Sequence, residues 1–119
     1  MSTELLPKEE LLQDMKDNHE YDTIWKSDIG KDCVNLNSSL AKWLTDRLMH
    51  LSLYGNTHPE HLSPKAWELK LQFTAARLHQ YNLVRNGQVE ICGSRYEEIR
   101  SEAKKAIHWV ADNFDSLFD

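Results

Sequence analysis

Apolar residues recur along most of this chain at spacings of three and four positions, which is the period of an amphipathic α-helix. Four stretches follow the pattern, at residues 1–18, 37–54, 63–81 and 94–119. Helices of this kind bury their apolar stripes against one another. The pattern therefore predicts an all-α protein, a small four-helix bundle-like domain that covers all 119 residues.

The second and third predicted helices, joined by the loop 55–62, form the centre of the chain. We expect Asn37 to cap the start of the second helix, and Gly55 to end it in the left-handed conformation. The apolar stripe of this helix consists of Leu40, Trp43, Leu44, Leu48 and Leu51. Arg47 lies within the stripe, so its side chain must either extend to solvent or pair with a carboxylate of a neighbouring helix, and we expect the pair.

The third helix has the clearest start signal of the chain. Ser63 is placed to cap it, and Pro64 suits its first turn. Its apolar face includes Trp67 and widens onto a second side at Leu69 and Phe73. This width predicts a helix at the centre of the bundle.

The helical pattern breaks after residue 81. Asn86-Gly87 is a strong two-residue turn signal, so a short β-hairpin at 83–91 and a loop both stay open. We expect the last helix to begin with a capping box formed by Ser94 and Glu97.

Residues 19–36 have no clean period, and two interpretations stay open. In one, the segment is irregular and Trp25 fills the core. In the other, residues 1–33 form a partly flexible arm that presents Tyr21 and Trp25 to a partner, because aromatic side chains often anchor interfaces.

The composition, with 40% apolar and 28% charged residues, is that of a soluble globular protein. No apolar run approaches the roughly 18 residues that a membrane helix needs, and the N-terminus lacks the pattern of a signal peptide. Cys33 and Cys92 suit a reducing compartment, and we expect each to be a small buried residue. We therefore expect a cytoplasmic protein without membrane partners.

The loop 55–62 contains His58, Glu60 and His61, which invite a metal hypothesis. A structural zinc site would need further soft ligands, and the two cysteines stand far apart in the sequence. We expect no metal here, and we keep the three residues as candidates for binding a partner. No nucleophile elbow, phosphate-binding loop or metalloprotease motif is present, so we expect neither an enzyme nor a cofactor.

The net charge of −5 is unevenly distributed along the chain. Residues 1–30 contain eight acids and three bases, whereas residues 31–90 contain five acids and seven bases. A general nucleic-acid binder usually has a clearer basic surface. A modest basic face is nevertheless available on the two central helices, formed by Lys42, Arg47, Lys65, Lys70 and Arg77.

Residues of the central stretch and the C-terminus also form a recognisable pattern. It consists of Asn35-Leu36-Asn37, Leu40-Ala41-Lys42-Trp43-Leu44, Arg47-Leu48, Pro59, Trp67, Leu71, Ala111, Phe114 and Leu117-Phe118-Asp119. Over about residues 34–81 and 103–119 this pattern resembles a family of small uncharacterised bacteriophage proteins. Four positions depart from it: the family has Trp, Asp, Pro and Trp in place of Val34, Asn37, Asp46 and Phe118. The resemblance implies a helical fold and a phage origin, and it implies no enzymatic activity.

The hypothesis that follows is a non-enzymatic phage protein that binds a host or phage protein in the host cytoplasm, and thereby modulates host machinery or inhibits a host defence effector. Two alternatives stay open: a nucleic-acid-associated accessory protein of phage replication or packaging, and a structural or assembly protein that forms a homo-oligomer. The candidate partner-binding residues are Tyr21, Trp25, Arg47, His58, Glu60 and His61. The candidates for the nucleic-acid alternative are Lys42, Lys65, Lys70 and Arg77.

Overall fold

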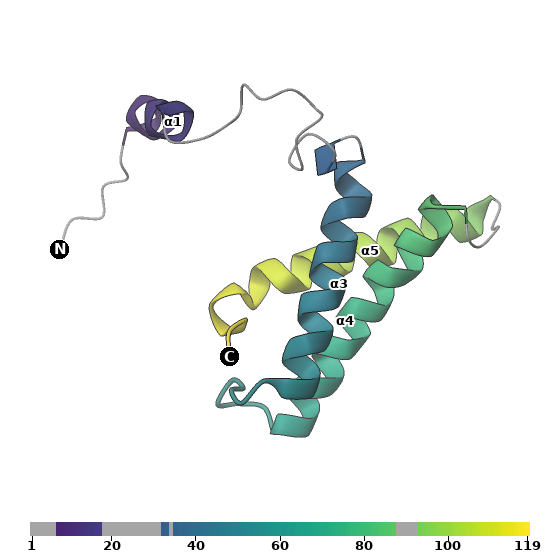
Figure 1. Cartoon of the computed structure of the whole chain (residues 1–119). Helices are drawn as coiled ribbons and strands as arrows, with labels where there is room; N and C mark the ends of the chain where they lie inside the picture. The colour runs from purple at the N-terminus through teal and green to yellow at the C-terminus, as the bar shows by residue number, and fades with distance from the viewer. Residues whose placement is uncertain (1–6, 18–31, 34, 88–92) are drawn as a thin grey trace. The chain divides into compact units, whose positions relative to one another are not determined.

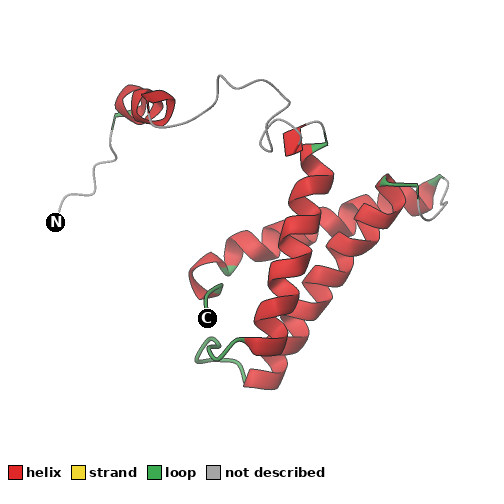
Figure 2. Cartoon of the chain, in the orientation of Figure 1, coloured by secondary structure: helices red, strands yellow, loops and turns green. Residues whose placement is uncertain are grey.

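The computed structural model describes residues 7–17, 32–33, 35–87 and 93–119, and these residues form helices and loops without a strand (Figure 2). The elements are α1 (Lys8–Asp17), α3 (Leu36–Tyr54), α4 (Pro64–Arg85), α5 (Ser94–Asp112) and the short 3₁₀ helix η1 (Phe114–Ser116). The chain divides into two compact units, Met1–Asn35 and Leu36–Asp119. The prediction of an all-α, bundle-like fold is confirmed.

Helix α1 begins directly after Pro7, whose carbonyl oxygen accepts from the N–H groups of Glu10 and Leu11 at 3.1 Å. Proline suits this position because the first amides of a helix have no intrahelical partner to lose. The apolar stripe of α1, which includes Leu11 and Met15, is exposed.

In the second unit, α4 is the central helix and packs against both α3 and α5 (Figure 1). Leu71 and Leu78 are two turns apart on α4 and are completely buried. The core around them consists of Ala41, Leu48, Trp67, Leu71, Ala75, Leu78, Ala103 and Ala106. The central position predicted for this helix is therefore confirmed, but the expected second covered side is wrong, because Leu69 and Phe73 are exposed. Trp67 also contacts Trp109 of α5, with ring centroids 5.4 Å apart, so the start of α4 is joined to the end of α5.

The start of α4 agrees with its sequence signal. The Ser63 hydroxyl accepts from the N–H of Ala66 at 3.1 Å, and Pro64 is the first helical residue. The predicted capping box of α5 is wrong. Gly93, with a φ of +68°, takes the cap position, and Ser94 is already helical with no side-chain cap bond at this end.

Asn37 is likewise not the residue before its helix, because α3 begins at Leu36. Its side-chain oxygen accepts from the N–H of Ser38, and its amide nitrogen donates to the hydroxyl of Tyr81 at 2.9 Å. The side chain thus joins the first turn of α3 to the last turns of α4.

The short β-hairpin left open at 83–91 is not formed by the residues that the structure describes. Leu83 and Val84, which would start its first strand, continue α4 instead. Adding residues to an existing helix gains one hydrogen bond each, so propagation outweighs a local turn signal here. Gly87 then lies just beyond the helix end with a φ of +73°. The remaining hairpin positions, residues 88–91, lie outside the described residues.

Gly55 ends α3, but for a different reason than the sequence suggested. The left-handed glycines among the described residues are Gly87 and Gly93. At Gly55, a Cβ atom would lie 2.5 Å from the carbonyl oxygen of Leu51, to which the Gly55 N–H donates at 2.9 Å. Close backbone approach, and not a positive φ, requires glycine at this position.

The loop after α3 is tied to the C-terminal residues. The N–H of Asn56 donates to Asp119 Oδ1 at 2.9 Å, and the hydroxyl of Thr57 donates to the carbonyl oxygen of Phe118 at 2.6 Å. These bonds place the loop 55–62 beside the chain that follows η1.

Two further findings concern expectations from composition. Cys33 is exposed, so the prediction of a buried residue is wrong at this position, and Cys92 lies outside the described residues. None of the helices in the described part of the chain is long and apolar enough to cross a membrane.

Candidate functional site

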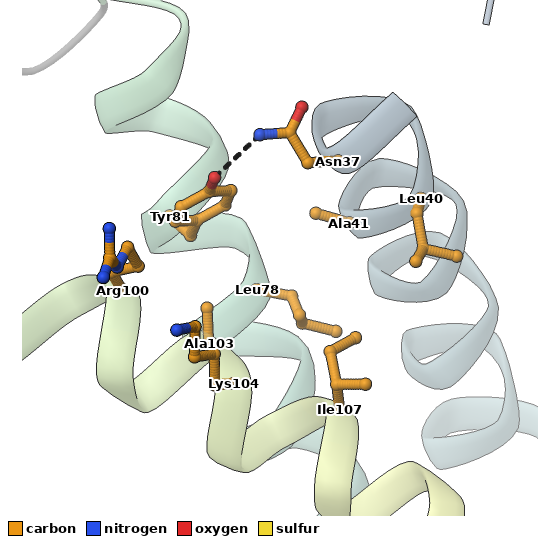
Figure 3. Close-up of a pocket in the computed structure, with 9 residues that line it drawn as sticks. All are labelled: Asn37, Leu40, Ala41, Leu78, Tyr81, Arg100, Ala103, Lys104 and Ile107. Carbon is orange, nitrogen blue, oxygen red and sulfur yellow. Dashed lines mark hydrogen bonds between the residues drawn. The ribbon is translucent and has the colours of Figure 1, made fainter. Parts of the chain in front are cut away.

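Two hollows lie between α3 and α5 and follow one another along both helices. The first has a volume of about 320 Å³ and has Leu78 and Tyr81 of α4 among its lining residues. In Figure 3 the side chains of Leu40, Leu78 and Ile107 converge on this space from three helices. The full lining is Asn37, Leu40, Ala41, Leu78, Tyr81, Arg100, Ala103, Lys104 and Ile107.

The second hollow, of about 540 Å³, lies farther along α3 and α5 and reaches η1. It is lined by Trp43, Leu44, Arg47, Leu48, His50, Leu51, Val110, Phe114 and Leu117. Most of these side chains are apolar. We refer to the two hollows together, with these two sets of lining residues, as the α3–α5 groove.

Large apolar side chains of the groove remain exposed to solvent. Trp43 is 53% exposed and Phe114 is 73% exposed, and both line the second hollow. Leu40 and Ile107 of the first hollow are exposed as well. The sequence pattern placed Leu40 and Trp43 in the apolar stripe of the second predicted helix, and so it did not identify them as surface residues.

Arg47 lies over the ring of Trp43, one helical turn earlier on α3. Its guanidinium carbon is 4.1 Å from the ring centroid, and its Nη1 donates to the carbonyl oxygen of Trp43 at 3.3 Å. No carboxylate of the described residues forms an ion pair with Arg47, so the expected pair is wrong and the side chain instead reaches solvent along an aromatic face. The one sequence signal for this feature was a basic residue four positions after Trp43 in an apolar stripe.

The charges that line the groove are all positive. They are Arg47 on α3 and Arg100 and Lys104 on α5, and no Asp or Glu is among the lining residues. Arg100 lies 3.6 Å from Glu97, whose carboxylate partly neutralises the positive charge of Arg100. Among the described residues no ion pair includes Lys104. A basic groove in a chain with net charge −5 is a local reversal of sign.

The loop candidates do not contribute to this groove. His58, Glu60 and His61 are exposed and line neither hollow. The Nδ1 atom of His58 lies 2.9 Å from the carbonyl oxygen of Pro59. Within the described ranges, no three His, Cys, Asp or Glu side chains are grouped closely enough to hold a metal ion. The other two candidates, Tyr21 and Trp25, lie outside the described residues.

The basic residues of the nucleic-acid alternative are largely paired with acids. Lys42 contacts Asp46 and Lys65 contacts Glu68, each at 2.9 Å. Arg77 of α4 contacts Glu102 of α5 at 3.2 Å.

The exception is Lys70, which has no ion pair among the described residues. Lys65 and Lys70 are five positions apart, which places them about 140° apart around the axis of α4. Lys70 and Arg77, seven positions apart, lie about 20° apart on one face of α4, so Lys65 is the base separated from them around this helix, and Arg77 is already paired with Glu102.

A second exposed apolar strip lies on α4. Leu69 and Phe73 are 40% and 62% exposed, and neither lines the α3–α5 groove. Phe73 is an exposed aromatic residue, as Phe114 is. The strip therefore supplies matched controls for experiments on the groove.

Comparison with known protein families, with curated proteins and with solved structures finds no match for this chain. Its function must therefore be inferred from the geometry of its own residues.

Proposed function

We propose that this chain is a non-enzymatic protein that acts by binding another protein. Following the resemblance to small phage proteins, we propose that the partner is a host or phage protein in the cytoplasm of the host cell. Binding would modulate host machinery or block a host defence effector.

The observation that carries the proposal is the exposure of Trp43 and Phe114 on the walls of the α3–α5 groove. Contiguous exposed apolar surface on a small domain often marks an interaction site. Tryptophan and arginine are also the residues most enriched among those that dominate binding energy at interfaces, and Trp43 and Arg47 lie in contact here.

The alternatives have weaker support. Lys42, Lys65 and Arg77 already have acidic partners, so a nucleic-acid accessory role would have to break these pairs or rely on Lys70. A structural or assembly role would use the same apolar surface between copies of the chain. We therefore retain protein binding as the main proposal.

Affinity capture tests this proposal. The tagged full chain is incubated with lysates of phage-infected and uninfected bacteria, with and without nuclease, and the captured proteins are identified by mass spectrometry. We expect a partner that is retained after nuclease treatment and that an unrelated tagged protein of similar net charge does not capture.

Two results would contradict the proposal. Retention of nucleic acid alone, or of proteins that all disappear with nuclease, would support the accessory-protein alternative. Capture of only further copies of this chain would support the assembly alternative.

A further inference from the structure

We infer that the α3–α5 groove binds an acidic amphipathic helix of the partner protein. This inference rests on the proposed function and adds the place of binding and the chemistry of the partner. It follows from the shape of the groove, from its charge and from the position of its aromatic residues.

The shape of the groove suits a helix. In the Leu36–Asp119 unit, α4 packs against α3 and α5, and the space between α3 and α5 is hollow along consecutive turns of both. On α3 the lining extends from Asn37 to Leu51, a length of about 21 Å at 1.5 Å per residue. A helix of roughly 14 residues spans this distance, and its apolar face would lie on the groove at spacings of three, four and seven positions.

The charge of the groove selects the sign of the partner. Arg47, Arg100 and Lys104 line it, and the lining contains no carboxylate that would neutralise them. Glu97 offsets part of the charge of Arg100, which leaves Lys104 and Arg47 as the stronger attractors. A helix with Asp or Glu beside its apolar stripe would pair with these groups, whereas a basic helix would meet like charges.

The aromatic residues of the second hollow are placed to anchor the partner. Trp43 and Phe114 come from opposite walls, α3 and η1, and both still expose more than half of their surface. An apolar side chain between them would bury both rings. The same contact would remove water from the Arg47–Trp43 pair, which strengthens a cation–π interaction.

A second copy of this chain fits the groove less well than an acidic helix. A symmetric dimer places the same surface of both copies face to face. Here that arrangement would bring the bases of one groove against those of the other. Like charges across an interface suppress association, so the charge pattern favours a different protein.

Site-specific photo-cross-linking in the full chain tests the inference. A benzophenone amino acid replaces Phe114 in one variant and, as the matched control, Phe73 in another. Both positions are exposed aromatics, so the replacement is expected to preserve the fold, which circular dichroism and thermal unfolding check. Each variant is irradiated in the lysate, and the cross-linked peptides are sequenced.

We expect the Phe114 variant to cross-link one partner segment that is net acidic and has apolar residues at helical spacing, and the Phe73 variant not to cross-link it. That segment is then synthesised, and its binding to the full chain is measured by fluorescence anisotropy. Lys104→Glu should weaken binding about tenfold, whereas the matched Lys70→Glu should change it by less than about twofold.

The outcomes separate this inference from the proposed function. If a partner is captured but cross-links through position 73, or if its segment is basic, the groove or its chemistry is wrong while protein binding stands. If position 114 cross-links only to a second copy of the chain, the groove is a self-association surface. If Lys70→Glu and Lys104→Glu weaken binding equally, the local charge of the groove does not select the partner.

Discussion

The guanidinium carbon of Arg47 lies 4.1 Å from the centre of the Trp43 ring, on an exposed face of α3. No Asp or Glu among the described residues forms an ion pair with Arg47. An arginine in an apolar stripe usually indicates a buried ion pair or a side chain that reaches solvent. Here the aromatic ring supplies the partner. Both residues of the pair line the second hollow of the α3–α5 groove.

The first prediction concerns the energy of this pair. Trp43→Ala and Arg47→Ala are combined in a double-mutant cycle, and we expect a coupling energy of about 0.5–1 kcal/mol because the pair is exposed. Urea unfolding of the four proteins measures it. Arg47→Ala combined with Phe73→Ala is the control and should be additive, because Phe73 lies on α4 and does not line the groove. If the effects of Trp43→Ala and Arg47→Ala on the free energy of unfolding were also additive, the ring would not stabilise the guanidinium.

The second prediction concerns the end of α3. Gly55→Ala should lower the free energy of unfolding by about 1–3 kcal/mol, because its Cβ would press against the carbonyl oxygen of Leu51 and displace backbone. Gly87→Ala is a useful contrast, since it meets no atom within 4 Å but has a φ of +73° and should cost about 1–2 kcal/mol through strain alone.

Hydrogen exchange distinguishes the two glycines. Gly55→Ala should also raise exchange in the loop 55–62, whose bonds to Phe118 and Asp119 depend on the loop position. Unchanged exchange there would mean that the loop absorbs the new methyl group without moving.

The third prediction concerns a buried amide on α4. Asn82 is 8% exposed, and its Oδ1 atom is buried with no hydrogen-bond partner among the described residues. An unsatisfied buried polar group costs about 1–3 kcal/mol, so Asn82→Leu should raise the free energy of unfolding by about 1 kcal/mol or more. Thermal and urea unfolding measure the change. Gln80→Leu, at an exposed position two residues away, should have little effect. A loss of stability in Asn82→Leu would mean that the amide has a structural role.

The fourth prediction uses two serines at helix starts. Ser63→Ala should cost about 1 kcal/mol, because the Ser63 hydroxyl caps α4 through the N–H of Ala66. Ser94→Ala should have almost no effect, because Ser94 lies inside α5 and does not cap it. Both values come from the same unfolding experiments. Equal costs would show that the sequence-based capping box at Ser94 was correct after all.

The sequence alone determined the helices of this protein. Spacings of three and four positions identified α1, α3, α4 and α5, and the Ser63-Pro64 signal identified the start of α4. These features depend on interactions between residues a few positions apart, so they can be predicted from the local sequence. The central position of α4 was predicted from residues that do not produce it, because Leu69 and Phe73, which widen its apolar face, remain exposed.

The tertiary structure decided which apolar residues stay at the surface. Trp43 and Phe114 belong to the same periodic stripes as the buried Leu48 and Ala106, and periodicity does not distinguish them. The difference depends on how far α3 and α5 lie apart where they pass α4, which is set by packing across the core and not by either helix alone. For the same reason the sequence placed Arg47 in an ion pair, whereas the fold placed it on Trp43 at the edge of an open groove.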